Sequence, residues 1–228
     1  MWSSRISTPI VYVLVTLFGI SSWLNLQGVF LEFPLIIPEV VEGWRLPATM
    51  GIIANSGTVA LIFVAIIRWC SRGRITYEIP VNIVVFSIGT GGLFALAFVW
   101  NKRAIIAGSP HSVYLMALSL CLALVDVVSS ATFTPFLNRY EPRFLNGFLL
   151  GETLSSVVPG LLGLAQGAGQ ETCQNGTSVH CPPRFSVQTY MLSLSGIISC
   201  SFLAFIILCA TNIGRDNANN IRKRFSSD

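Results

Sequence analysis

The chain has 228 residues, of which 53% are hydrophobic and only 11% are charged, and its mean hydropathy is +0.68. Because soluble globular domains usually carry about 25% charged residues, this composition excludes an ordinary water-soluble fold. The net charge is +4, but the cations stand at the ends of apolar runs and form no basic stripe, which argues against nucleic-acid binding. The expected surrounding is therefore a lipid bilayer.

Six apolar segments succeed one another, each long enough to cross a bilayer as a helix of about 20 residues. The first is longer than the hydrophobic region of a signal peptide, and no small-residue cleavage site follows it, so we expect it to be retained. We predict an all-α integral membrane fold, with a six-helix bundle over residues 1–211 and a cytosolic tail over 212–228. The helices are expected at about 9–31, 48–69, 79–100, 112–137, 144–167 and 186–211.

The basic residues indicate the orientation of this bundle. A cytosolic N-terminus places ten of the 14 Lys and Arg residues on the inside, as the positive-inside rule requires. Only Arg45, Lys102, Arg103 and Arg184 then lie outside. Because six crossings return the chain to its starting side, we expect both termini to be cytosolic.

The loop before the last helix agrees with an extracellular position. Asn175-Gly176-Thr177 is an N-glycosylation sequon, and Cys173 and Cys181 lie in the compartment where disulfides persist. We predict a glycan on Asn175 and a bridge between the two cysteines. The alternative is a chance sequon beside two free thiols.

Three acidic residues fall inside or at the edge of predicted helices, namely Glu32, Asp126 and Glu152. A charge at mid-membrane costs about 2.5–3.5 kcal/mol on insertion scales, and no Lys or Arg in a predicted helix core pairs with these acids. Each must therefore be protonated, line a wet cavity, meet a polar solute or find a partner outside this chain. For Asp126 the alternative is a structural acid hydrogen-bonded to neighbouring Ser or Thr residues.

Polar residues accompany these acids at helical spacing. In the first helix they share one face, and Pro34 predicts a break just after Glu32. In the fifth helix they recur over most of the span, which is not expected of a lipid-facing helix. The stripes comprise Ser21, Asn25, Gly28 and Glu32 in the first helix, Asp126, Ser130 and Thr134 in the fourth, and Glu152, Ser155, Ser156, Pro159, Gly163 and Gln166 in the fifth.

Other patterns in the sequence favour packing over chemistry. The GxxxG pairs Gly147/Gly151 and Gly163/Gly167 predict close contact between helices. No nucleophile elbow, zinc-protease, Walker or dinucleotide motif occurs, and the six Cys and two His residues show no metal-ligand spacing. His111 is expected to be a solvated loop residue. The sequence thus predicts neither an enzyme nor a metal site.

Short motifs follow one another in a fixed order over most of the chain. They are GISSW at 19–23, QGVFLEFP at 27–34, EGWRLP at 42–47, ALVD at 123–126, TFTPF at 132–136, Gly151-Glu152, and AQGAG at 165–169 with Cys173. In this order they resemble the N-terminal half of the eukaryotic riboflavin transporters, although Gln27 stands where that family usually has Asn.

The resemblance implies a plasma-membrane solute carrier that takes up riboflavin by alternating access, without an enzymatic cofactor. It also implies a bundle like the N-terminal half of a major facilitator or equilibrative nucleoside transporter, built of two three-helix repeats. Family members have further helices, so the expected partner is a second bundle or a full-length homologue. The chain would then be a fragment, a truncated isoform or a gene-model product.

We expect the solute site near the middle of the membrane. Trp23 could pack on the isoalloxazine ring of riboflavin, while amides and carboxylates could bind the ribityl hydroxyls and the imide edge. The predicted set is Trp23, Asn25, Gln27, Glu32, Asn55, Asp126, Thr132, Glu152 and Gln166. Two alternatives remain: a truncated, non-transporting protein that acts through a full-length partner, and a carrier of another flat polar solute such as a nucleoside.

Overall fold

The computed structural model describes residues 3–70, 78–106, 108–138, 140, 142–167, 171–174, 177–180 and 182–210. Helices form most of this part, and the strands make two antiparallel hairpins, β1–β2 and β3–β4. The elements are α1 (Ser3–Ile20), α2 (Leu24–Leu31), α3 (Phe33–Ile36), the 3₁₀ helix η1 (Gly43–Arg45), α4 (Leu46–Ser56), α5 (Val59–Cys70), α6 (Glu78–Val99), β1 (Ala104–Ile106), β2 (Ser109–His111), α7 (Val113–Leu137), α8 (Arg143–Gln166), β3 (Glu171–Gln174), β4 (Thr177–His180) and α9 (Val187–Ala210).

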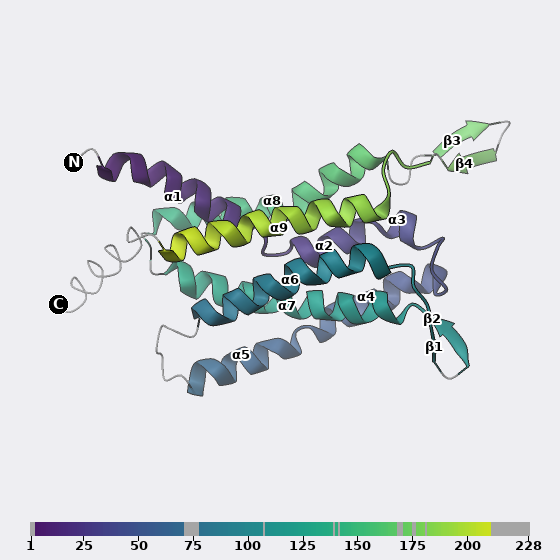
Figure 1. The fold of residues 1–228 in the computed structure, drawn as a ribbon, viewed down its shortest axis with the longest axis horizontal. Coiled ribbons are helices and arrows are strands. Elements are labelled where there is room, and N and C mark those ends of the chain that lie inside the picture. The colour runs from purple at the N-terminus through teal and green to yellow at the C-terminus, as the bar shows by residue number, and fades with distance from the viewer. Residues whose placement is uncertain are drawn as a thin grey trace.

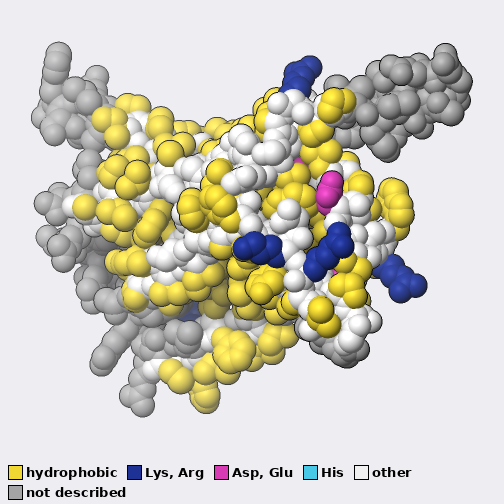
Figure 2. All heavy atoms as spheres, turned by 45° about the vertical axis from the view of Figure 1, so that its right-hand side comes forward, with side chains coloured by type: hydrophobic (Ala, Val, Ile, Leu, Met, Phe, Trp, Pro, Cys, Tyr) yellow, Lys and Arg dark blue, Asp and Glu magenta, His cyan; other side chains and the backbone are white. Residues whose placement is uncertain are grey.

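The long helices run side by side along one axis, with both hairpins at one end of the molecule and the start of α1 and the end of α9 at the other (Figure 1). Within the described residues, five helices are long and apolar enough to cross a membrane, and the bent pair of α1 and α2 would make a sixth. Figure 2 shows hydrophobic side chains over much of the described surface, and Lys and Arg side chains standing apart from one another near the hairpin end. The fold is therefore an all-α membrane protein, as predicted.

The first span is bent rather than continuous. It was expected as one helix over 9–31, but α1 and α2 meet at an angle of 51°. Between them, the hydroxyls of Ser21 and Ser22 donate to the carbonyls of Phe18 and Gly19, each at 2.8 Å. Such local side-chain bonds compete with the helical ladder, so the Ser-Ser pair favours a break that the apolar run concealed. A second interruption falls at Glu32, between α2 and α3, beside Pro34.

The second span is also interrupted, between α4 and α5, where a single helix over 48–69 was expected. Ser56 donates to the carbonyl of Ile53 and Thr58 to that of Asn55, both at 2.7 Å. Gly57 lies so close to α7 that a Cβ atom there would be 3.0 Å from the carbonyl oxygen of Ala123. Despite the interruption, residues Gly43–Cys70 still form one candidate span.

A cluster of phenylalanine rings fills the centre of the bundle. The rings come from α1, α6, α7, α8 and α9, and their centroids lie 4.2–6.4 Å apart, distances at which aromatic pairs attract. All six side chains are buried. This Phe cluster, which joins five helices, consists of Phe18, Phe86, Phe133, Phe136, Phe148 and Phe205.

One of the two predicted glycine contacts is present and the other is not. A Cβ atom on Gly151 would overlap the carbonyl oxygen of Thr16 and stand 2.9 Å from the Cα atom of Gly19, so α1 and α8 touch through their backbones. By contrast, the space around Gly163 is open, and Gly167 ends α8 with a positive φ of 78°. The prediction of close packing at Gly163/Gly167 was therefore wrong: Gly167 serves a left-handed helix end.

Candidate functional site

Asp126 of α7 is directed at the first turn of α2. Its side chain is 1% exposed, and it accepts hydrogen bonds from Nδ2 of Asn25 at 2.7 Å and from the backbone N–H of Leu26 at 2.9 Å. The free N–H groups at the start of a helix favour a negative partner. Asp126 thus fixes the position of α2 after the bend, and it does so through an amide and the backbone rather than through neighbouring Ser or Thr hydroxyls.

The same bend is contacted by a second residue of α7 and by α6. The hydroxyl of Ser129, one turn after Asp126, lies 3.0 Å from the carbonyl oxygen of Ser22 in the bend. On α6, Gly89 leaves room for Asn25, since a Cβ atom there would be 3.3 Å from Oδ1 of Asn25. α7 therefore bonds to the break through both Asp126 and Ser129, and α6 leaves space beside it for Asn25.

Trp23 and Glu152 form an accessible pair beside this buried group. Trp23 lies in the bend, is 37% exposed, and donates from Nε1 to Oε1 of Glu152 on α8 at 3.1 Å. Glu152 is half-buried. An aromatic face and a carboxylate oxygen are thus presented together where the helix is interrupted.

Glu32 and Gln166 are brought together at the end of the bundle that carries the hairpins. Both side chains are fully buried, one at the junction of α2 and α3 and the other in the last turn of α8. Nε2 of Gln166 donates to the carbonyl of Phe185 at 3.1 Å. The pair is separate from the Asp126 group, since no hydrogen bond between described residues joins the two.

The three remaining predicted residues are scattered. Thr132 of α7 is buried and hydrogen-bonded at 2.6 Å to Oδ1 of Asn82 on α6, a residue that the sequence did not single out because it stands alone in an apolar run. Gln27 is exposed on α2. Asn55 is exposed on α4, and its amide donates to the carbonyl of Gly51 in its own helix at 2.8 Å.

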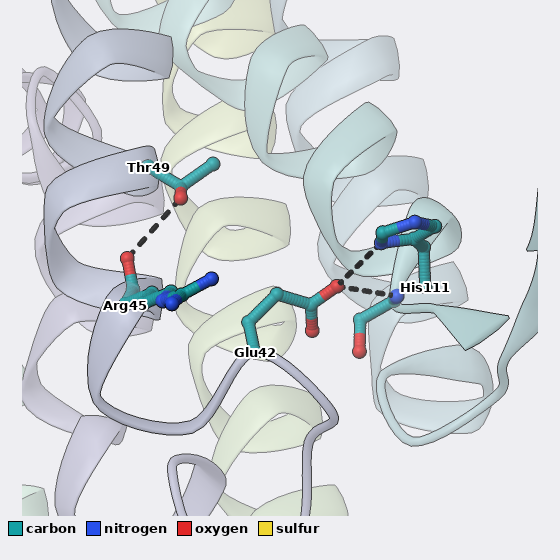
Figure 3. Close-up of polar contacts among 5 residues, drawn as sticks. Glu42, Arg45, Thr49 and His111 are labelled. Atoms are coloured by element: carbon teal, nitrogen blue, oxygen red, sulfur yellow. Dashed lines mark hydrogen bonds and ion pairs between the residues drawn. The ribbon is translucent and has the colours of Figure 1, made fainter. Parts of the chain in front are cut away.

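A second polar group lies at the hairpin end and involves Glu42, just before η1 (Figure 3). Oε1 of Glu42 accepts the backbone N–H of Ser112 at 2.9 Å and lies 3.7 Å from Nδ1 of His111. Burial alone would raise the pKa of Glu42, but the Ser112 hydrogen bonds and the nearby His111 outweigh it, so that the pKa is lowered. His111 is therefore half-solvated but directed at a carboxylate, which its loop position did not reveal.

The predicted glycan and disulfide fall largely on residues that the structure does not describe. The backbone of β3 pairs with that of β4, and Cys173 stands opposite Ser178. Asn175, Cys181 and the side chain of Cys173 lie outside the described part, as does the predicted tail over 212–228. The glycan and the bridge stay predictions.

Comparison with known proteins adds to this geometry. The chain is 33% identical to riboflavin transporter 2 of Salmo salar, an alignment that covers 88% of this chain and 48% of the relative. It is 36% identical to solute carrier family 52, riboflavin transporter, member 2 of Homo sapiens, over 86% of this chain and 45% of the relative. Member 3-B of Danio rerio is 33% identical, with 86% and 47% covered.

The chain therefore spans about half the length of these curated relatives. No solved structure matches it. The family model described as solute carrier family 52, riboflavin transporter, matches residues 7–227, which is nearly the whole chain. On this match and these identities, the chain belongs to the riboflavin transporter family, solute carrier family 52.

Proposed function

We propose that this chain forms one half of a plasma-membrane transporter that takes up riboflavin by alternating access. The observation that carries the proposal is the accessible Trp23–Glu152 pair at the bend of the first span. Transporters commonly build their solute sites from interrupted helices, and membership of the family supports riboflavin as the solute. Transport of this kind needs no enzymatic step and no cofactor.

The burial of the predicted residues suggests a division of roles. Trp23, Gln27 and Glu152 are accessible, and we assign them direct contact with riboflavin. The indole would pack on the isoalloxazine ring, while the amide and the carboxylate would bind the ribityl hydroxyls and the imide edge. Asn25 and Asp126 are sealed, and they would position the bend.

The other predicted residues belong to the proposed set but lie away from the bend between α1 and α2. Thr132 would tie α7 to α6 below the bend through Asn82. Asn55 would reach the solute from α4, where its side chain is exposed. Glu32 and Gln166 would close the site at the hairpin end, where both are buried.

A second bundle is part of the proposal, because alternating access requires two bundles that rock about one site. This bundle would be the N-terminal half, of two three-helix repeats, in an arrangement like that of major facilitator or equilibrative nucleoside transporters. The relatives are about twice as long as the matched region, which supports a second half. It would come from a longer chain or from a full-length homologue.

We propose that the hairpin end is extracellular and that both termini are cytosolic. The start of α1 and the end of α9 lie at the end opposite the hairpins (Figure 1). The positive-inside rule supports this direction, because Arg45, Lys102, Arg103 and Arg184 are the only cations expected at the hairpin end. In this orientation Asn175 would be glycosylated, and Cys173 and Cys181 would be oxidised.

The proposal is tested by titrating the purified chain, in lipid nanodiscs, with riboflavin and following flavin fluorescence. The unaltered chain is expected to bind riboflavin, and Trp23→Ala to weaken binding about tenfold or more, as the loss of an aromatic contact of about 1.5 kcal/mol implies. The matched control is Trp69→Ala, which removes an indole that is 82% exposed on α5.

Two outcomes would contradict the proposal. Equal loss of binding in both tryptophan variants would mean that the bend is not the site. Displacement by a nucleoside as effective as displacement by unlabelled riboflavin would indicate another flat polar solute. Uptake of radiolabelled riboflavin by cells that express the chain then separates a working transporter from a chain that binds but needs its second half.

A further inference from the structure

Glu32 is a fully buried acid whose two carboxyl oxygens have no hydrogen-bond partner among the described residues. It stands between α2 and α3, where the chain is interrupted. The Gln166 side chain from the last turn of α8 lies beside it. Oε1 of Gln166 is likewise buried without a partner in the described part of the chain, while Nε2 of the same amide donates to the carbonyl of Phe185.

Apart from the Gln166 side chain itself, the described groups around Glu32 supply no donor to these three oxygens. Tyr190 of α9 is within electrostatic reach of Glu32, but its hydroxyl donates to the carbonyl of Pro159 at 3.1 Å. The exposed guanidinium of Arg184, which precedes α9, is directed at the carbonyl of Ala165 at 3.4 Å. These are the titratable or charged groups that described contacts place around Glu32 from α8, α9 and the segment between them.

The two carboxyl oxygens of Glu32 and Oε1 of Gln166 are three buried acceptors that face one another without a hydrogen bond. One added hydrogen atom, on the Glu32 carboxyl group, would join two of them. A charged carboxylate sealed from water without a donor or a cation is strongly disfavoured, and such a group becomes neutral instead. A protonated carboxyl group has one O–H donor, which is what Oε1 of Gln166 needs. A divalent cation fits the site less well, because Ca²⁺ and Mg²⁺ take about six or more oxygen ligands, and the site offers three.

We propose that Glu32 is a proton-binding site and that its protonated carboxyl group donates to Oε1 of Gln166. The hydrogen bond would join the α2–α3 junction to the end of α8. Loss of the proton would leave a charge facing the Gln166 carbonyl and the Tyr190 hydroxyl oxygen, so the two segments would separate. This inference does not depend on which solute the chain carries.

The protonation state of Glu32 is tested directly by infrared spectroscopy of the purified chain in lipid nanodiscs. A protonated carboxyl group absorbs at a different frequency from a carboxylate, so the two forms can be distinguished. The unaltered chain is expected to show a carboxylic-acid band near neutral pH that fades in alkaline solution, and Glu32→Gln to remove it. The matched control is Glu39→Gln, the same chemical change at an exposed side chain in the same outer segment. Asp126→Asn identifies any band that belongs to Asp126.

Thermal unfolding of the same samples gives a second readout. If folding takes up a proton at Glu32, the stabilising contribution is complete in acid solution and is lost as the pH rises. As the pH is raised from about 5 to about 8, the unfolding temperature of the unaltered chain should therefore decrease. The unfolding temperature of Glu32→Gln should decrease less, since the Gln amide keeps a donor at every pH. A Glu32 band absent at all pH values, or midpoints with equal pH dependence in both chains, would overturn the proposal.

Discussion

Two spans of this bundle are interrupted, and they are held in different ways. The break between α1 and α2 bends the chain by 51° and is hydrogen-bonded by residues of other helices, namely Asp126, Ser129 and Glu152. The break between α4 and α5 is capped by hydroxyl bonds within its own helix, and the two helices still form one candidate span. A break that buried partners from other helices hold in place can carry a binding site, whereas a local one mainly adjusts the path of a helix.

The largest expected effect follows from removal of the buried acceptor at the first break. Asp126→Ala leaves the Asn25 amide and the Leu26 N–H without their partner, and each unsatisfied buried group costs about 1–3 kcal/mol. We expect the free energy of unfolding in mild detergent to fall by about 2–4 kcal/mol. Asn55→Ala is the matched change at the second break, where the amide bonds only within α4, and it should cost less than about 1 kcal/mol. Equal losses would remove the distinction between the breaks.

The helix contact below the first break gives the next largest effect. Gly151→Ala places a methyl group against Thr16 and Gly19 of α1, and overpacking of this kind costs about 1–3 kcal/mol. Gly163→Ala, in the same helix, meets open space and should be neutral or slightly stabilising, because alanine is the better helix former. Thermal unfolding of the two variants checks this prediction, and a loss in Gly163→Ala as large as that in Gly151→Ala would contradict it.

A smaller effect is expected from the accessible pair at the bend. Trp23→Phe keeps an aromatic ring but removes the donor to Oε1 of Glu152. Because the pair is partly exposed, the stability should drop by about 0.5–1.5 kcal/mol. If the indole and the carboxylate act as a pair, the loss caused by Trp23→Phe should disappear when Glu152 is already Ala, which has no acceptor. A double-mutant cycle on the free energy of unfolding is the measurement. Additive effects would show that the contact contributes nothing.

The smallest effect concerns the link outside the membrane at Glu42. Its pKa is lowered in the folded chain, so the stability that it contributes is present above the ordinary pKa of Glu and is lost as the pH falls through the lowered value. Glu42→Gln should therefore flatten the acid side of the stability profile, whereas Glu39→Gln should leave it unchanged. A profile that stays the same in Glu42→Gln would show that the Ser112 and His111 contacts are without energetic effect.

The long helices could be predicted from the sequence because hydrophobic length alone determines a membrane span. The predicted 79–100 and 112–137 correspond to α6 at Glu78–Val99 and α7 at Val113–Leu137. The bend at Ser21–Trp23 could not, because it depends on a partner, Asp126, that lies 100 residues from Leu26 in the chain. The first apolar segment reads as one continuous helix, and the Ser21-Ser22 pair is the one local feature in it that favours an interruption.

The candidate site shows the same limit. Polarity within the membrane identified Asn25, Asp126 and Glu152, and the structure joins the first two directly and places the third beside Trp23. Helical spacing placed Asn25 on the polar stripe of the first helix and Gln27 off it, and the structure buries the first side chain and exposes the second. The spacing did not indicate that the accessible side would be the one to present Trp23 to Glu152. Asn82 was missed because it belongs to no stripe, and its partner Thr132 becomes apparent only when α6 and α7 are packed.

We propose that the accessible Trp23–Glu152 pair at the first break binds riboflavin. The most direct test is the dissociation constant of riboflavin for Glu152→Gln and for Thr153→Ala, measured side by side by flavin fluorescence. Thr153 is the exposed neighbour on α8, and its hydroxyl bonds only to the carbonyl of Leu150. A hydrogen bond to a charged acceptor is worth about 1 kcal/mol more than one to a neutral acceptor, so Glu152→Gln should bind riboflavin about fivefold more weakly. Thr153→Ala should bind as the unaltered chain does. Unchanged binding in Glu152→Gln would contradict the claim.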